Sequence, residues 1–106
     1  MTGVKKYLQP KDHLMNAIHD VAELQKARTL SCDSPYGKIS LEVTMYASKW
    51  EYRFAVSDIG ANRSAVSIEL AGDAKDARRL INHEFALLDY VLKDRAQVEL
   101  SEMEDS

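Results

Sequence analysis

The sequence lacks several features that mark specialised classes of protein. It contains one cysteine, Cys32, so no disulfide can form within the chain, and we expect a reducing, cytoplasmic environment. No apolar run approaches the ~18 residues that a membrane-spanning helix requires, so we expect no membrane partner. The first residues, MTGVKKYL, lack the apolar segment of a secretory signal, and we expect none.

An excess of positive charge is also missing. The 106 residues carry a net charge of −3, and the segment 94–106, with five acids and one base, accounts for −4. Residues 1–93 therefore carry +1, which does not favour a strongly basic nucleic-acid-binding protein. We predict a single domain over residues 1–93 and an acidic, disordered tail over residues 94–106.

Three segments in the middle of the chain alternate between apolar and polar residues. The pattern covers residues 38–46, 50–57 and 65–70, with Ile39, Tyr52 and Ile68 on the apolar side. A period of two with β-branched and aromatic residues on one side predicts antiparallel strands with one buried face. A shorter alternation over residues 28–33 predicts an additional first strand, joined to the next by the turn residues 34–37.

Matching apolar residues across neighbouring strands predicts the pairing register. The pairs are Asp33 with Lys38 and Leu30 with Leu41, then Leu41 with Phe54 and Met45 with Trp50, and lastly Phe54 with Ile68 and Val56 with Val66. On the opposite face this register brings Glu42, Arg53 and Glu69 into one row, and Ser31, Ser40, Ala55 and Ser67 into another. Cys32 is predicted to point into the core as a small, unreactive hydrophobe.

Two amphipathic helices are predicted to flank the strands. The first begins near Pro10 and ends near Ala27, and the second begins at Asp73, a good N-cap, and ends near Lys93. Residues 1–9 show no pattern, and we expect an irregular lead-in. The predicted fold is an α+β two-layer sandwich in the order helix, antiparallel meander of three or four strands, helix, with both helices on one face of the sheet.

Glu84 interrupts the apolar stripe of the second helix. A buried carboxylate is costly unless it has a partner, and burial raises its pKa. Two interpretations stay open: Glu84 is a functional acid in a pocket, or it meets a polar partner or a water-accessible edge.

The first turns of the second helix carry Lys75, Arg78 and Arg79. These cations could bind a phosphate or another acid, although Asp73 and Asp76 beside them also fit an ordinary solvated surface. His19 and Glu23 have a spacing that a metal could use, but no further ligand accompanies them, so we predict no metal site and no cofactor.

No catalytic signature is visible, and we predict a non-enzymatic chain. The leading hypothesis is a cytoplasmic protein-interaction or regulatory module, such as a host or phage regulator or an inhibitor, that binds another protein or forms a homodimer. The candidate binding residues are Ser40, Ala55, Ser67 and Arg53 on the open sheet face. The alternative is a nucleic-acid-binding module that uses this face or Lys75, Arg78 and Arg79. The open face offers no aromatic ring on which a base could stack, which favours the first hypothesis.

Overall fold

A computed structural model describes the backbone of residues 1–71 and 76–104 and the side chains as far as residue 93. The elements in chain order are β1 (Thr2–Tyr7), α1 (Lys11–Leu24), β2 (Arg28–Asp33), a short 3-10 turn (Ser34–Tyr36), β3 (Lys38–Met45), β4 (Ser48–Gly60), β5 (Arg63–Leu70) and α2 (Ala77–Glu104).

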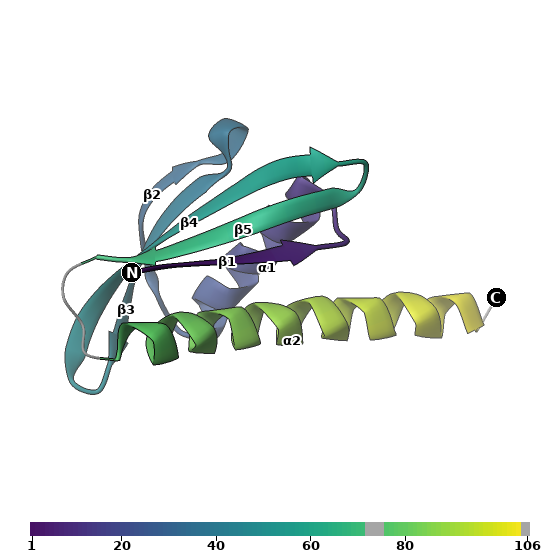
Figure 1. The fold of residues 1–106 in the computed structure, drawn as a ribbon. Coiled ribbons are helices and arrows are strands. Elements are labelled where there is room, and N and C mark those ends of the chain that lie inside the picture. The colour runs from purple at the N-terminus through teal and green to yellow at the C-terminus, as the bar shows by residue number, and fades with distance from the viewer. Residues whose placement is uncertain (72–75, 105–106) are drawn as a thin grey trace.

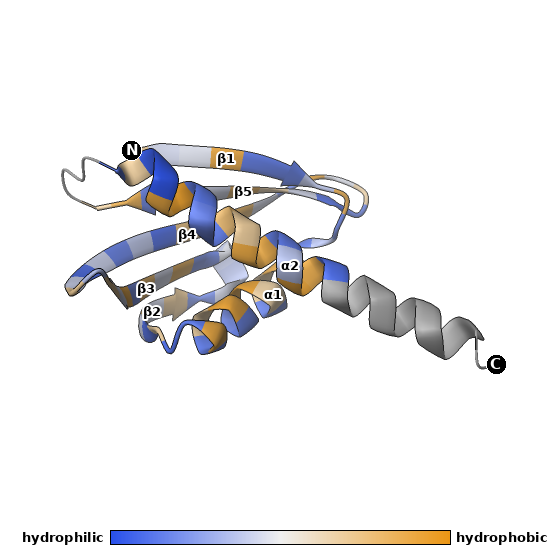
Figure 2. Cartoon of the chain, turned by 90° about the horizontal axis from the view of Figure 1, so that it is seen from below, coloured by the Kyte–Doolittle hydropathy of each residue, from blue (hydrophilic) through white to orange (hydrophobic). Residues whose placement is uncertain are grey.

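The five strands form one antiparallel sheet in the order β1-β5-β4-β3-β2. Both helices lie on the same face of this sheet, and α2 runs along its length (Figures 1 and 2). The predicted α+β two-layer sandwich is therefore confirmed. None of the helices in the described part of the chain is long and apolar enough to cross a membrane.

The predicted lead-in is instead strand β1, which pairs along β5 from Thr2 opposite Glu69 to Tyr7 opposite Ser64. The sequence of β1 does not show the alternation of apolar and polar residues that marks the other strands. Its helix-facing positions are Gly3, Lys5 and Tyr7, and Tyr7 alone among them has a large side chain with an apolar ring. Gly3 allows α2 to approach closely. A methyl group at this position would lie 2.9 Å from Ile81 Cγ2.

The β3–β4 register differs by two residues from the prediction. Leu41 lies opposite Tyr52 and Met45 opposite Ser48, because the connecting turn contains only Tyr46 and Ala47. Both turn residues have positive φ, as the tight hairpin turn with a right-handed twist requires. The shift of two keeps every apolar residue on the predicted face, which is why matching apolar residues could not detect it.

The β2–β3 hairpin follows the prediction at its closed end and departs from it further along. Asp33 lies opposite Lys38, as predicted, but a bulge between Thr29 and Ser31 leaves Leu30 unpaired and places Thr29 opposite Leu41. The prediction that Cys32 is buried is wrong. Cys32 is exposed, because every residue of the edge strand β2 is exposed, including those on the helix-facing side.

The helices have bounds that differ from those predicted. α1 begins after Pro10, as expected, and ends at Leu24, three residues early, since Lys26 takes a left-handed conformation with φ of 54°. α2 is assigned as Ala77–Glu104, past Lys93. The predicted N-cap Asp73 lies outside the described residues, as do the side chains of the predicted tail, 94–106.

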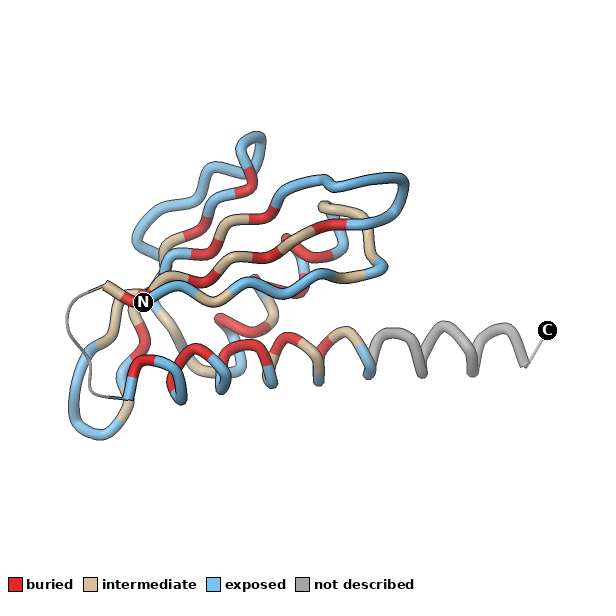
Figure 3. The backbone as a smooth tube through the Cα atoms, in the orientation of Figure 1, coloured by how far each residue is buried: buried red, intermediate tan, exposed pale blue. Residues whose placement is uncertain are grey.

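The core lies between the sheet and the two helices (Figure 3). Tyr52 and Phe54 of β4 are fully buried there, while Trp50 at the end of the same row is half-buried and contacts the core. All three rings lie on the predicted face. Burial of this kind is the main stabilising contribution, at roughly 1.5–3 kcal/mol for each large apolar side chain.

Candidate functional site

The most unusual residue in the core is Glu84 on α2. Its side chain is 0% exposed, and it lies between Ile81 and Leu88 on the buried stripe of the helix. Oε1 accepts a hydrogen bond of 2.7 Å from Nε2 of Gln25, the residue that follows α1. Oε2 is buried and has no hydrogen-bond partner among the residues that the structure describes. The interpretation that Glu84 meets a polar partner or a water-accessible edge holds through its partner Gln25, and the side chain does not reach water.

A second buried polar atom without a partner is the hydroxyl of Tyr52 on β4. Burial is the main cause that raises the pKa of the Tyr52 hydroxyl, and the charge of Glu84 raises this pKa further. Two such groups cost about 1–3 kcal/mol each when they stay unpaired, and unpaired buried groups in native proteins require an explanation.

Burial raises the pKa of Glu84 from 4.5 to about 7, and the hydrogen bond from Gln25 opposes this shift. A carboxyl group with this pKa is present in both protonation states near neutral pH. It can therefore accept or donate a proton, which is the property of a general acid–base group. The same group can accept a hydrogen bond through Oε2 when ionised and donate one when protonated.

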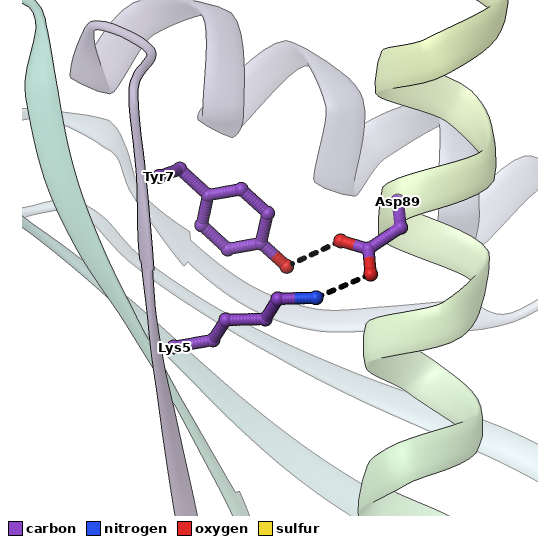
Figure 4. A network of polar contacts seen from close by, with 3 residues as sticks. All are labelled: Lys5, Tyr7 and Asp89. Carbon is purple, nitrogen blue, oxygen red and sulfur yellow. Dashed lines mark hydrogen bonds and ion pairs between the residues drawn. The ribbon is translucent and has the colours of Figure 1, made fainter.

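Asp89 lies one and a half turns further along α2 and has a very different environment. Lys5 forms an ion pair with Oδ2, and the Tyr7 hydroxyl donates a hydrogen bond of 2.9 Å to Oδ1 (Figure 4). Burial, together with this hydrogen bond, raises the pKa of Tyr7. We interpret these three residues as a link that holds α2 against β1. Sequence reasoning missed this link because β1 was not predicted.

The open sheet face carries the predicted binding residues in a different arrangement. The predicted row Ser31, Ser40, Ala55 and Ser67 is divided by the new register, because Ser40 lies opposite Arg53, and Ala55 lies between Lys38 and Ser67. Ser40, Ala55 and Ser67 are half-buried, and Arg53 is exposed.

The predicted acid–base–acid row is only partly formed. Arg53 Nη1 donates to Glu69 Oε1 at 3.2 Å, as predicted. Glu42, however, lies opposite Glu51 rather than Arg53, because of the two-residue shift between β3 and β4. Lys49 lies 3.9 Å from Glu42 and compensates part of this like-charge contact.

The basic start of α2 is described only in part. Arg78 and Arg79 are exposed and line a shallow, open hollow with Asp76 and Asn82, whereas Lys75 lies outside the described residues. Asp76 in this hollow balances part of the positive charge of Arg78 and Arg79. Among the described residues no group of three or more histidine, cysteine or acidic side chains is placed to hold a metal ion.

No family model and no curated protein sequence matches the chain. Solved structures do share its fold. CalU16 from Micromonospora echinospora superposes with a TM-score of 0.63 at 12% identity, over 85% of this chain and 70% of that one. A START superfamily protein from Mycobacterium smegmatis gives a TM-score of 0.50 at 10% identity, over 92% and 96% of the two chains.

The di-domain ARO/CYC StfQ from the steffimycin biosynthetic pathway is also similar, at 13% identity and a TM-score of 0.48, over 95% of this chain and 46% of that one. The prediction that the chain is not an enzyme is corrected by the likeness to CalU16, because the shared fold removes the ground on which catalysis was excluded. At these identities the likeness shows the fold alone and assigns no reaction.

Proposed function

We propose that the chain binds a small, largely apolar molecule between α2 and the sheet, and that Glu84 and Tyr52 hold its polar group. The observation that carries this proposal is the pair of buried polar atoms, Glu84 Oε2 and the Tyr52 hydroxyl, that have no partner in the described structure. Both atoms lie in a core to which both layers contribute apolar residues, among them Ile18 and Leu88 of the helices and Phe54 and Ile68 of the sheet. Pockets for small molecules combine an apolar lining with a few such polar groups.

The two groups define the chemistry of the ligand. The Tyr52 hydroxyl donates a hydrogen bond, and the ionised Glu84 accepts one, so a ligand that carries an acceptor beside a donor pairs with both. Because the pKa of Glu84 is about 7, the carboxyl can also exchange a proton with the ligand at neutral pH. Both groups are enclosed, so ligand entry requires α2 to shift away from the sheet.

The proposal can be tested with N-phenyl-1-naphthylamine, a neutral apolar fluorophore with one N–H donor. We expect its fluorescence to rise on binding to the wild-type chain. The Tyr52 hydroxyl can also accept a hydrogen bond from the N–H of this probe, so Tyr52→Phe removes a ligand contact and should weaken binding about tenfold. Tyr36→Phe is the matched control, because Tyr36 is 73% exposed and lies outside the core.

The pH dependence of the same binding identifies the acid. The dissociation constant of the wild-type chain should change between about pH 6 and pH 8, where Glu84 titrates. Glu84→Gln should abolish this change, and the exposed Glu23→Gln should retain it. The proposal fails if the wild-type chain does not bind the fluorophore, or if the two tyrosine variants bind it equally well.

A second candidate function is protein interaction through the open sheet face, in a cytoplasmic regulator or inhibitor. It is supported by the low bulk of Ser40, Ala55 and Ser67, next to the exposed Val4 of β1, which lies opposite Ser67. A flat face of this kind permits close approach of another protein. Substituting Ala55→Arg should then release the partner without unfolding the chain, whereas a salt-dependent gel shift would instead support nucleic-acid binding.

A further inference from the structure

Strand β2 is an uncovered edge of the sheet. It is the last strand in the order β1-β5-β4-β3-β2, and all six of its residues are exposed. The next three residues, Ser34–Tyr36, are also exposed, whereas Gly37 before β3 is buried. The tube of Figure 3 shows the long exposed stretch of this hairpin. Along such an edge the backbone N–H and C=O groups that point away from the sheet can pair with a strand of another chain.

The bulge in β2 determines which side chains share a face. Arg28 lies opposite Glu42 and Asp33 lies opposite Lys38, so Arg28 and Asp33 both lie on the open face. In a regular strand, residues five apart point to opposite faces. The extra residue at the bulge changes this parity and places a cation and an anion on one face, at the two ends of the strand.

Thr29 and Cys32 of β2 also share one face of the sheet. Thr29 and Cys32 lie opposite Leu41 and Ile39, whose side chains are buried, so both belong to the helix-facing side. If β2 pairs antiparallel with a second β2 about an axis between Leu30 and Ser31, Arg28 meets Asp33 of the second copy at both ends. In the same register Thr29 meets Cys32 of the second copy, and every one of these pairs shares a face.

The charges at the ends of β2 are available for such contacts. In the described part of the chain, neither Arg28 nor Asp33 belongs to an ion pair. The other edge of the sheet, β1, contains two lysines and no acid, so no two-fold register of that strand brings opposite charges together. The complementarity is therefore a property of the β2 edge.

We propose that β2 pairs with β2 of a second copy of this chain, so that the two five-stranded sheets join across a two-fold axis. We choose a second copy as the occupant, because a two-fold partner presents the same cation and anion in reversed order. This interface uses the strand edge and leaves the open sheet face and the core site unchanged.

Charge reversal tests the interface and its register together. Sedimentation equilibrium should show a dimer for the wild-type chain. Arg28→Asp alone and Asp33→Arg alone should each raise the dimer dissociation constant about tenfold or more, because like charges then meet at both ends. The double variant restores both contacts in reversed order and should recover wild-type dimerisation. Thermal melting of each variant checks that the new neighbours of Glu42 and Lys38 leave the fold intact.

A cross-link gives an independent test of the register. Directly opposed residues of antiparallel strands have Cα atoms about 4.5–5.5 Å apart, within the range that a disulfide spans. Thr29→Cys should therefore form a covalent dimer with Cys32 of the second copy under mild oxidation. Thr44→Cys is the control, because Thr44 is exposed on β3 and away from the proposed axis, so it should cross-link only slowly.

Three results would overturn the proposal. The first is a wild-type chain that stays monomeric at every concentration. The second is a dimer that the double charge reversal fails to restore in folded protein. The third is a dimer that Ala55→Arg dissociates and Arg28→Asp does not, which would move the contact to the open sheet face.

Discussion

Glu84 and Asp89 are two carboxylates on one helix, and their environments differ in almost every respect. Glu84 is fully buried, is bound by the neutral amide of Gln25 and keeps one oxygen without a partner. Asp89 lies at the rim of the same helix, where both of its oxygens are bound by charged or hydroxyl groups of β1. A satisfied polar group at a rim stabilises the fold, whereas an unsatisfied one in the core reduces its stability.

Whether a polar group has a partner distinguishes residues that stabilise the fold from residues that we propose bind a ligand. The Lys5–Tyr7–Asp89 link has every group paired and needs no ligand to explain it (Figure 4). Among the described residues, Glu84 and Tyr52 each keep one buried polar atom without a partner, and they lie on the two layers between which we place the ligand. Substitutions at the two carboxylates should therefore have distinct signatures.

The largest expected effect is a pH dependence of stability that belongs to Glu84. Its pKa is about 7 in the folded chain and near 4.5 when solvated, so the folded state binds the proton more tightly between these values. The contribution of Glu84 to the free energy of unfolding, taken as the difference between the wild-type chain and Glu84→Gln, should be greatest below about pH 4.5 and fall by ~3 kcal/mol as the pH rises to about 7. Urea unfolding at several pH values should show no such fall in Glu84→Gln, and an unchanged fall in Asp89→Asn.

Gly3→Ala tests the close packing of α2 against β1. The added methyl group would meet Ile81 at 2.9 Å and Phe85 at 3.2 Å, on the turns of α2 that flank Glu84. We expect a loss of ~1–3 kcal/mol in the free energy of unfolding, which is typical of an overpacked core. Gly60→Ala is the matched control, because its nearest contact would be 3.9 Å, and it should leave stability nearly unchanged. Equal effects of the two substitutions would argue against the close contact of β1 and α2.

Asp89→Ala tests the rim link. The substitution removes the acceptor of Tyr7 and the ion-pair partner of Lys5, and we expect it to lower the free energy of unfolding by ~1 kcal/mol. Much of the ion pair is exposed, so most of this loss should come from the hydrogen bond to Tyr7. The double variant with Tyr7→Phe should then lose little more than either single variant. Fully additive losses would show that Tyr7 and Asp89 do not interact.

The smallest expected effect is that of Tyr52→Phe. The Tyr52 hydroxyl has no partner to lose, so its removal should change the free energy of unfolding by less than ~1 kcal/mol or increase it slightly. Tyr7→Phe removes a hydroxyl with a partner and should be more destabilising. A reversed order in thermal unfolding would mean that Tyr52 has a structural partner and that the proposed site is wrong.

The sheet and its buried face could be predicted from the sequence. The β3–β4 register and strand β1 could not, and each error has a physical cause. Alternation located β3, β4 and β5 and placed Tyr52 and Phe54 in the core. Matching apolar residues determines which face of the sheet each side chain occupies, but it does not distinguish registers that differ by two residues. The β3–β4 register is set by the two-residue turn Tyr46–Ala47. Neither turn residue is a glycine, so the sequence does not indicate this turn. β1 was missed because Gly3 and Lys5 occupy helix-facing positions.

The candidate site was predictable only in part. Glu84 was conspicuous because it interrupts an apolar stripe, and its burial followed from that pattern. Gln25 and Tyr52 gave no such signal, because one follows a helix and the other has the expected position of a core aromatic residue. Only the packing of α1 and β4 around α2 brings these side chains into one region.

A carbon-13 NMR titration of the Glu84 carboxyl tests directly whether this buried group titrates near neutral pH and is reached by a ligand. Comparison with Glu84→Gln assigns the signal, and addition of N-phenyl-1-naphthylamine tests whether a ligand reaches the group. We expect a midpoint near pH 7 that moves when the fluorophore binds. A midpoint near 4.5, unaffected by the fluorophore, would show that Glu84 is solvated and would contradict a ligand site at this carboxyl.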